Sequence, residues 1–235
     1  MPVFELDKNE NYFPPAYLAD SSGLLAIGGD LSPERLLTAY EMGIFPWFNP
    51  NEPILWWSPN PRFVLFPEKV KVSKSMRQIL RSGKYQVTFD KDFLGVIKGC
   101  QEMYRPGQNG TWISEEIIDS YYELHKIGFI HSVEVWRDQE LVGGLYGGCF
   151  GKCFFGESMF AKVSNTSKVG FIHLAKNLEE HGFEFIDCQV YTRHLESLGA
   201  TMIPRLDFLK SVEKNSKLPL YKGSWNDIFR VDFEF

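Results

Sequence analysis

The sequence predicts an α+β fold, in which helices pack on a mostly antiparallel β-sheet. Three apolar segments, 132–136, 141–146 and 153–158, follow one another with short turns between them, a pattern typical of an antiparallel meander. Helix-capping residues precede amphipathic segments on both sides of this meander. A chain of 235 residues, 44% of them hydrophobic, is long enough for one large domain or two modest ones.

Composition excludes two broad classes of protein. The hydrophobic content is too high for a disordered chain, and no run of about 18 apolar residues is present to span a bilayer. The N-terminus has neither the basic start nor the apolar stretch of a secretion signal, so we expect a cytoplasmic protein without a membrane partner. The cysteines at 100, 149, 153 and 188 form no Cys-x-x-Cys pair, and we expect buried thiols rather than disulfides or zinc ligands.

The N-terminal part begins with a helix and continues with a segment rich in Pro and Trp. Ser32 is a suitable N-cap, Pro33 occupies the first helical position, and Gly43 ends the helix. Three tryptophans and four prolines follow within 44–59. Proline confines such a segment to turns and sheet edges. Its aromatic side chains are either the core of a small domain or a platform on which a nucleic-acid base stacks.

Positive charge is concentrated in one part of an otherwise acidic chain. The formal charge of −5 argues against a protein that coats nucleic acid without specificity. The segment 62–84, however, carries +6, because it contains seven basic residues and a single acid. A helix is predicted at 73–82, and Lys74, Arg77 and Arg81 share one of its faces. This face is either an ordinary solvated surface or a contact for nucleic-acid phosphates.

The remaining elements alternate between strands and helices. In chain order we predict a strand at 85–89, a short helix at 91–98, a loop at 105–112, a helix capped by Ser114 that runs to 127, the meander, a helix at 166–181 and a strand at 185–189. Apolar residues recur at helical spacing in the two long helices, and Gly128 and Gly182 end them. Beyond Pro204 the sequence contains nothing diagnostic.

Several common chemistries lack their motifs in this sequence. The segment Gly28-Gly29-Asp30 is not a dinucleotide fingerprint and no Walker-type loop is present, so nucleotide-driven chemistry is not expected. The five histidines show no His-Glu-x-x-His spacing, and we expect no metal site. The Gly-x-Ser-x-Gly elbow of serine hydrolases is also missing.

Three polar side chains lie within otherwise apolar predicted strands. A carboxylate in a hydrophobic strand is costly unless it has partners or a function, so Glu157 and Asp187 are either satisfied buried acids or catalytic groups. Side chains alternate along a strand, which places Asp187 and Gln189 on one face. There, Asp187 is expected to accept a hydrogen bond from the Gln189 side-chain amide and to orient it.

Six ordered segments carry a resemblance to a known family. They are GLLAIGGDLSP (23–33), GIFPWF (43–48), WWSP (56–59), GTWI (110–113), GESMF (156–160) and IDCQ (186–189). Together, within a similarity that extends over residues 12–204, they resemble the bacterial leucyl/phenylalanyl-tRNA–protein transferase family.

The resemblance implies both a reaction and a fold. The reaction is transfer of Leu or Phe, with Met as a further candidate donor, from aminoacyl-tRNA to the N-terminal Arg or Lys of a protein. This transfer marks the protein for degradation by the N-end rule. The implied fold is a small N-terminal domain, expected at 1–62, packed on a GCN5-related acyltransferase-like domain, expected at 63–235.

The resemblance also assigns residues to the two substrates. Trp47 and Trp112 would hold the 3′-terminal adenosine of the tRNA, in agreement with the stacking of bases on indole rings. The donor side chain would enter an apolar pocket formed by Leu145, Phe154, Met159, Phe171, Leu174, Leu178, Ile186 and Cys188. The tRNA backbone would lie against Lys74, Arg77, Arg81 and Lys84. An apolar pocket discriminates by only about 1–3 kcal/mol per methylene, so overlapping use of the donors is expected.

The reaction itself is aminolysis of an ester, in which positioning supplies much of the acceleration. Gln189, oriented by Asp187, would hold the acceptor amine. Glu157 would fix the ribose or attract the cationic acceptor. The sequence leaves open whether the proton departs through water, Asp187 or the adenosine hydroxyls.

A coenzyme A donor is not expected. The signature that GCN5-related enzymes use for it, Gln/Arg-x-x-Gly-x-Gly/Ala, is replaced by NTSKVG at 165–170. We therefore expect no cofactor, and nothing in the sequence requires more than a monomer. Two alternatives remain: a coenzyme A-dependent acyltransferase, and a non-catalytic module that binds RNA or recognises protein N-termini.

Overall fold

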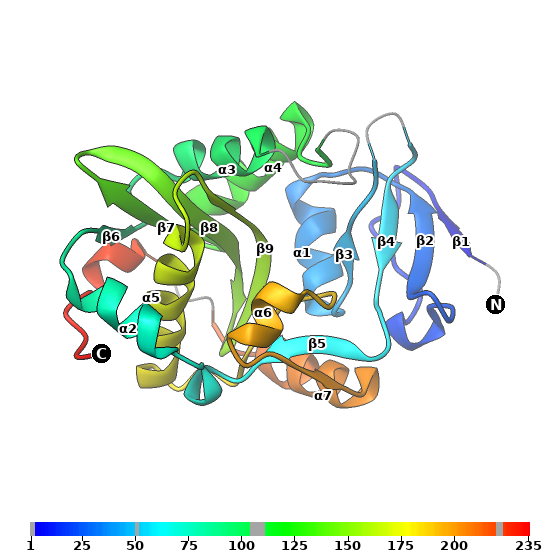
Figure 1. The fold of residues 1–235 in the computed structure, drawn as a ribbon. Helices are drawn as coiled ribbons and strands as arrows, with labels where there is room; N and C mark the ends of the chain where they lie inside the picture. The colour runs from blue at the N-terminus through cyan, green and yellow to red at the C-terminus, as the bar shows by residue number, and fades with distance from the viewer. Residues whose placement is uncertain (1–2, 50–51, 104–110, 220–222) are drawn as a thin grey trace.

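The computed structural model describes residues 3–49, 52–103, 111–219 and 223–235. The described strands form two sheets, and helices cover both faces of the larger one (Figure 1). The α+β class predicted from the sequence is therefore confirmed. The predicted loop at 105–112 lies mostly outside the described residues. Within those residues, no helix combines the length and the apolar character needed to cross a membrane.

The smaller sheet is built from the N-terminal part of the chain and has the strand order β1-β2-β4-β3 among the described residues. Its strands are β1 (Phe4–Leu6), β2 (Leu24–Gly28), β3 (Phe45–Pro46) and β4 (Leu55–Trp57). Helix α1 (Pro33–Glu41) has the predicted cap, because the Ser32 side chain accepts a hydrogen bond from the Arg35 backbone N–H. Trp56 is fully buried and donates its indole N–H to the Gly28 carbonyl oxygen at 2.9 Å, so this tryptophan belongs to the core.

The larger sheet has the order β11-β5-β10-β9-β8-β7-β6 over the described part of the chain. Its strands are β5 (Arg62–Leu65), β6 (Gln86–Phe89), β7 (Ile130–Arg137), β8 (Glu140–Phe150), β9 (Cys153–Ala161), β10 (Phe185–Asp187) and β11 (Thr201–Ile203). Neighbours are antiparallel except β9 and β10, which are parallel. The predicted meander is β7, β8 and β9. Each strand is longer than predicted, because strands buried on both faces lack the polar alternation that marks their ends.

Strand β10 is shorter than predicted. The sequence indicated a strand at 185–189, but pairing with β9 ends at Asp187. Gln189 has a φ of 61°, a left-handed conformation that does not continue an extended strand. Strand β9 runs on to Ala161, so β9 and β10 diverge beyond Asp187. This divergence leaves room for a cavity at the edge of the parallel pair.

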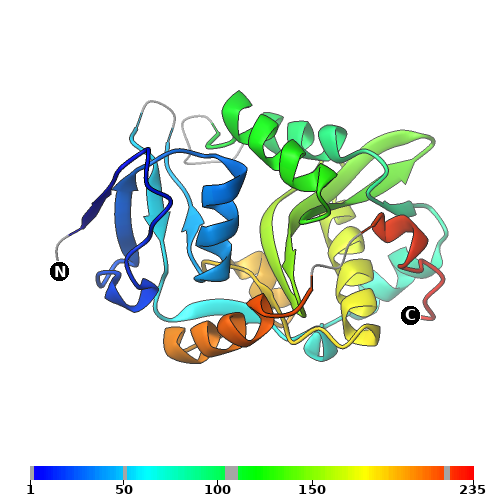
Figure 2. The ribbon, with the colours of Figure 1, turned by 180° about the vertical axis from the view of Figure 1, so that it is seen from behind.

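Helices pack on both faces of the larger sheet. Helices α3 (Phe93–Glu102) and α4 (Glu115–Lys126) cover one face and α5 (Thr166–Glu180) covers the other (Figures 1 and 2). The buried apolar side chains accordingly form two clusters. One contains residues of α5 and of the sheet face beneath it. The other joins residues of the smaller sheet and α1 with residues of α3, α4 and the opposite sheet face, so a single core extends through both sheets.

Helix α2 (Lys74–Arg81) is the predicted basic helix, and it lies near the C-terminus on the outside of the molecule (Figure 1). Its predicted cap is present, because the Ser73 side chain accepts a hydrogen bond from the Met76 backbone N–H. Met76, which is not on the basic face, is buried. The four cysteines are buried, as the sequence predicted.

The described C-terminal part includes the helices α6 (Arg193–Ser197) and α7 (Arg205–Ser216), and α7 was not predicted from the sequence. Helix α7 contacts both α1 and β8 (Figure 2). Arg205, at its start, donates through Nη1 to the Ser58 carbonyl at 2.6 Å and through Nη2 to the Tyr17 carbonyl at 3.0 Å. Through these bonds, Arg205 connects two N-terminal segments to the start of α7. The domain boundary between residues 62 and 63 stays a prediction.

Candidate active site

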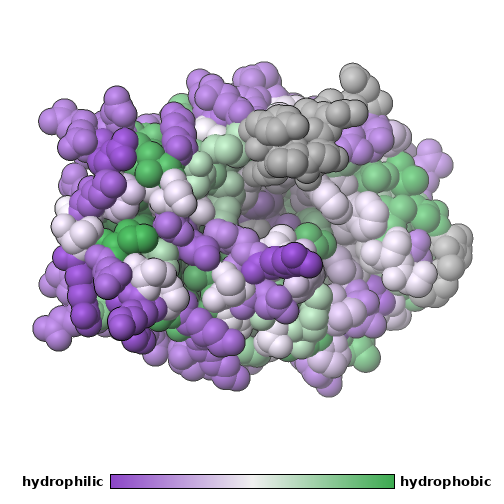
Figure 3. Space-filling view, in the orientation of Figure 1, coloured by the Kyte–Doolittle hydropathy of each residue, from purple (hydrophilic) through white to green (hydrophobic). Residues whose placement is uncertain are grey.

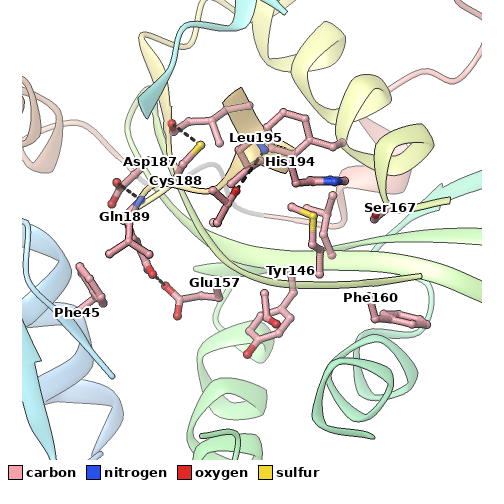
Figure 4. Close-up of a pocket in the computed structure, with 18 of the residues that line it drawn as sticks. Phe45, Tyr146, Glu157, Phe160, Ser167, Asp187, Cys188, Gln189, His194 and Leu195 are labelled. Carbon is pink, nitrogen blue, oxygen red and sulfur yellow. Dashed lines mark hydrogen bonds between the residues drawn. The ribbon is translucent and has the colours of Figure 1, made fainter. Parts of the chain in front are cut away.

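A cavity of about 500 Å³ opens between β3, strand β9 and the segment that follows β10. The space-filling view shows a hollow at the centre of this face (Figure 3). Most of its wall is apolar, but Asp187, Gln189 and Glu157 gather on one side of it, away from Phe160 and Ser167 (Figure 4). The cavity thus combines an apolar interior with a polar edge.

Six of the eight predicted pocket residues line this cavity: Leu145, Phe154, Met159, Phe171, Ile186 and Cys188. The other two, Leu174 and Leu178, are not among its lining residues, and their contact with the donor side chain stays a prediction. Both are fully buried in the core between α5 and the sheet. They share a helix face with Phe171, but each further turn moves a side chain about 5.4 Å along the axis, which takes them past the cavity.

Trp47 and Trp112 both line the cavity, although they come from distant segments of the chain. Trp47 directly follows β3 and is 40% exposed. The indole N–H of Trp57 donates to the Trp47 carbonyl oxygen at 2.6 Å, and the two ring centroids lie 6.0 Å apart. Within the aromatic segment, Trp56 therefore belongs to the core, while Trp47 presents an indole at the cavity; the stacking of a nucleic-acid base on Trp47 stays a prediction.

Asp187 has a different partner from the one predicted. Its carboxylate is fully buried and forms a two-point ion pair with Arg62, with Nε to Oδ1 at 2.8 Å and Nη2 to Oδ2 at 2.6 Å. Asp187 Oδ1 also accepts the backbone N–H of Gln189 at 2.9 Å. The prediction that it binds the Gln189 side-chain amide was wrong, because the chain turns left-handed at Gln189 and the two side chains do not alternate as in a strand.

The Gln189 side chain instead reaches Glu157. Its Nε2 donates to Glu157 Oε1 at 3.0 Å (Figure 4). Since an amide nitrogen only donates, Oε1 is the Gln189 atom that can accept an N–H from a ligand. The two polar side chains that the sequence placed on separate strands are thus brought together.

Glu157 ends a chain of hydrogen bonds that begins in the N-terminal part. The Tyr40 and Tyr121 hydroxyls lie 2.7 Å apart, and Tyr121 donates to Glu157 Oε2 at 3.1 Å. Burial raises the pKa of both phenols well above the usual value, so they remain protonated. Burial also raises the pKa of Glu157 to about 7, against the opposing effect of the tyrosine hydrogen bonds. At neutral pH this carboxyl is therefore present in both protonation states.

The substitution Glu157→Gln is expected to remove a pH dependence of stability. The folded pKa of about 7 exceeds the ordinary value of 4.5, so the fold favours the protonated acid. That contribution is complete below about pH 4.5 and is lost as the pH rises through 7. Relative to the variant, the wild-type free energy of unfolding should fall by up to about 3 kcal/mol across this range. Urea unfolding of both proteins at pH 5 and pH 8 measures it, and a constant difference contradicts the assignment.

The basic residues of α2 and its C-terminal side do not line the cavity. Lys74, Arg77, Arg81 and Lys84 are exposed. The Arg81 Nε donates to the Phe235 carbonyl oxygen. The helix and its basic face are confirmed, whereas the contact with tRNA stays a prediction.

Sequence reasoning missed three residues that hold the site. They are Arg62, Tyr40 and Tyr121, and each is at most 1% exposed. Arg62 binds Asp187, Tyr121 binds Glu157, and Tyr40 is linked to Glu157 through Tyr121. Arg62 was counted only as one charge of the basic segment. Its position beside the apolar run Phe63-Val64-Leu65 was the available signal, because an arginine in a buried strand requires a partner.

Comparison with known proteins decides the family. A family model described as leucyl/phenylalanyl-tRNA protein transferase matches residues 64–213, and a model of the N-terminal domain of the same transferase matches residues 29–60. The chain belongs to the leucyl/phenylalanyl-tRNA–protein transferase family. The first match contains the cavity residues of β9 and β10, and the second contains Trp47.

Relatives named leucyl/phenylalanyl-tRNA–protein transferase match nearly the full chain. The relative from Syntrophus aciditrophicus is 55% identical over 96% of this chain and 94% of its own length. The one from Flavobacterium johnsoniae is 58% identical over 84% and 93%, and the one from Myxococcus xanthus is 50% identical over 97% of both. Among solved structures, a GCN5-related N-acetyltransferase from Kribbella flavida aligns at 9% identity with a TM-score of 0.36, over 70% of this chain and 58% of that one.

Proposed function

We propose that this chain transfers Leu or Phe from aminoacyl-tRNA to the N-terminal Arg or Lys of a protein, which marks that protein for degradation. The observation that carries the proposal is one cavity in which two indoles, an apolar pocket and the Gln189–Glu157 pair meet, in a chain of this transferase family. The indoles suit the terminal adenine of the tRNA, the apolar pocket suits the donor side chain, and the Gln189–Glu157 pair suits the acceptor amine.

The aminoacyl-adenosine end of the tRNA fits the cavity in one orientation. The adenine base stacks between Trp47 and Trp112, a contact worth about 1–3 kcal/mol for each base stacked on an aromatic ring. The amino-acid side chain then lies among Phe154, Met159 and Phe171. Because this wall is apolar, it accepts Leu, Phe and Met with differences of about 1–3 kcal/mol per methylene.

The acceptor amine approaches from the polar edge. Its N–H donates to Gln189 Oε1 while its nitrogen forms a bond with the ester carbonyl carbon. The bond from that carbon to the ribose oxygen then breaks, and the ribose leaves as an alcohol. Both Asp187 oxygens are engaged by Arg62, so we assign Asp187 to holding the turn at Gln189 rather than to moving the proton. Glu157, with its pKa of about 7, is the side chain that takes up the amine proton, and it returns one proton to the ribose oxygen as the ester bond breaks.

The basic face of α2 contacts the phosphates of the tRNA acceptor stem. We expect Arg77→Ala with Arg81→Ala to weaken tRNA binding and to reduce the slope of log K against log salt by about one unit per arginine. Transfer from a minimal aminoacyl-adenosine donor should be unchanged, because this donor lacks the stem. A matched control is Lys126→Ala with Lys210→Ala, since both lysines are exposed on other helices. Equal losses with both donors count against the contact.

A single assay tests the function. The protein is incubated with Leu- or Phe-charged tRNA and a peptide that begins with Arg, and mass spectrometry measures addition of one residue at the peptide N-terminus. An N-acetylated peptide serves as the control that cannot accept. Product formation from acyl-coenzyme A instead would favour the acyltransferase alternative, and tRNA binding without transfer would favour the non-catalytic module.

A further inference from the structure

We propose that Arg62 is a positioning residue that holds the adenosine platform and the Gln189 turn in a fixed relation to each other. The inference rests on the proposed transfer reaction and adds to it a residue that need not touch either substrate. Its basis is that one buried guanidinium binds groups from both sides of the cavity.

Toward the acceptor side, Arg62 fixes the turn that carries Gln189. Its two-point pair with Asp187 orients the carboxylate whose Oδ1 accepts the Gln189 backbone N–H at 2.9 Å. That bond stabilises a left-handed φ of 61° at Gln189, a conformation that residues other than glycine rarely adopt. This backbone conformation directs the Gln189 side chain toward Glu157.

Toward the donor side, the same guanidinium holds the segment that leads to Trp47. Arg62 Nη1 donates to the Gly43 carbonyl oxygen at 3.3 Å, and its Cζ lies 4.7 Å from the centre of the Phe45 ring. Phe45 belongs to β3, and Trp47 follows that strand directly. Phe208 of α7 also packs on the guanidinium, with 4.4 Å from Cζ to the ring centre.

A contribution to stability alone does not account for this arrangement. Both partners of the pair are at most 1% exposed, and replacing a buried ion pair by apolar residues of similar volume is often neutral or stabilising. The planar fork of arginine, however, can bind two carboxylate oxygens and a carbonyl at fixed angles, which neither an apolar side chain nor the point charge of lysine reproduces. We therefore assign to the Arg62–Asp187 pair the role of fixing the positions of the Gln189 turn and of the segment that leads to Trp47.

The test is the double variant Arg62→Met with Asp187→Leu, which removes the pair without leaving a buried charge. Its free energy of unfolding should stay near the wild-type value. Its kcat should fall by about 10- to 100-fold, by the same factor with aminoacyl-adenosine and with aminoacyl-tRNA, because a misplacement of about 1 Å costs up to about 100-fold. A folded double variant with wild-type kcat overturns the proposal.

Two further variants keep the result interpretable. Arg62→Lys retains the charge and so covers the case in which the double variant does not fold; it should also lose kcat, and wild-type kinetics in Arg62→Lys overturns the proposal. Arg35→Met with Asp30→Leu removes another ion pair of a buried arginine, outside the cavity, and should leave kcat unchanged in the folded protein. If the wild-type protein transfers nothing, the proposed function fails and this inference fails with it. If the wild-type protein is active and the Arg62 variants are equally active, only the inference is refuted.

Discussion

Alanine in place of Asp187 is expected to lower the free energy of unfolding by about 3–5 kcal/mol, a large fraction of the roughly 5–15 kcal/mol that is typical of folded proteins. The substitution leaves the Arg62 guanidinium buried without its counter-ion, and desolvation of an uncompensated charge dominates the cost. Urea unfolding monitored by tryptophan fluorescence measures the change.

The matched comparison for Asp187→Ala is the same substitution combined with Arg62→Met. Removing the arginine removes the uncompensated charge, so the second substitution should restore part of the stability lost in the first. Additive losses in the double variant would show that the two side chains do not act as a pair.

Alanine in place of Gln189 is expected to lower the rate of transfer by about 100-fold with little loss of stability. The Gln189 side chain is partly exposed and its removal takes away the group that holds the acceptor amine, an effect on orientation rather than on folding. Alanine has no branched Cβ, and the bond from the residue 189 backbone N–H to Asp187 does not involve the side chain, so we expect the turn to be preserved. Product formation at saturating donor, with tRNA binding measured in parallel, gives the result.

Gln189→Asn is the control for that experiment, because it keeps the amide but shortens its reach to Glu157. It should lose activity as the alanine variant does. Full transfer by Gln189→Ala would remove Gln189 from the mechanism, whatever its effect on tRNA binding.

Local patterns predicted the regular elements well. The caps Ser32, Ser73 and Ser114 accept the expected backbone N–H groups, because capping depends on residues within one turn. The meander was recognisable from apolar runs and turns. The helix α7 was missed, since it begins after a proline without a side-chain cap and its burial is decided by contacts with distant segments.

The site was predictable as a set of residues but not as a set of contacts. Glu157 and Asp187 were identified because charge in an apolar strand is costly. Arg62 is 125 residues from its partner Asp187, and Tyr121 is 36 residues from its partner Glu157. Tyr40 is linked to Glu157 through Tyr121. No local sequence pattern encodes such pairings. The burial of Leu174 and Leu178 in the core beside the cavity could not be predicted for a related reason, since helical periodicity gives the face of a side chain and not how far a cavity extends along the axis.

The core shared by the two sheets limits how the site can work. Side chains of α1 and the smaller sheet pack in one cluster with those of α3 and α4, and the Tyr40–Tyr121 hydrogen bond crosses it. A hinge that opened the cavity by swinging the N-terminal part away would expose this apolar interior to water. The indole of Trp47 and the amide of Gln189 are therefore held at a preset separation before either substrate arrives, and substrate binding need not pay for assembling them.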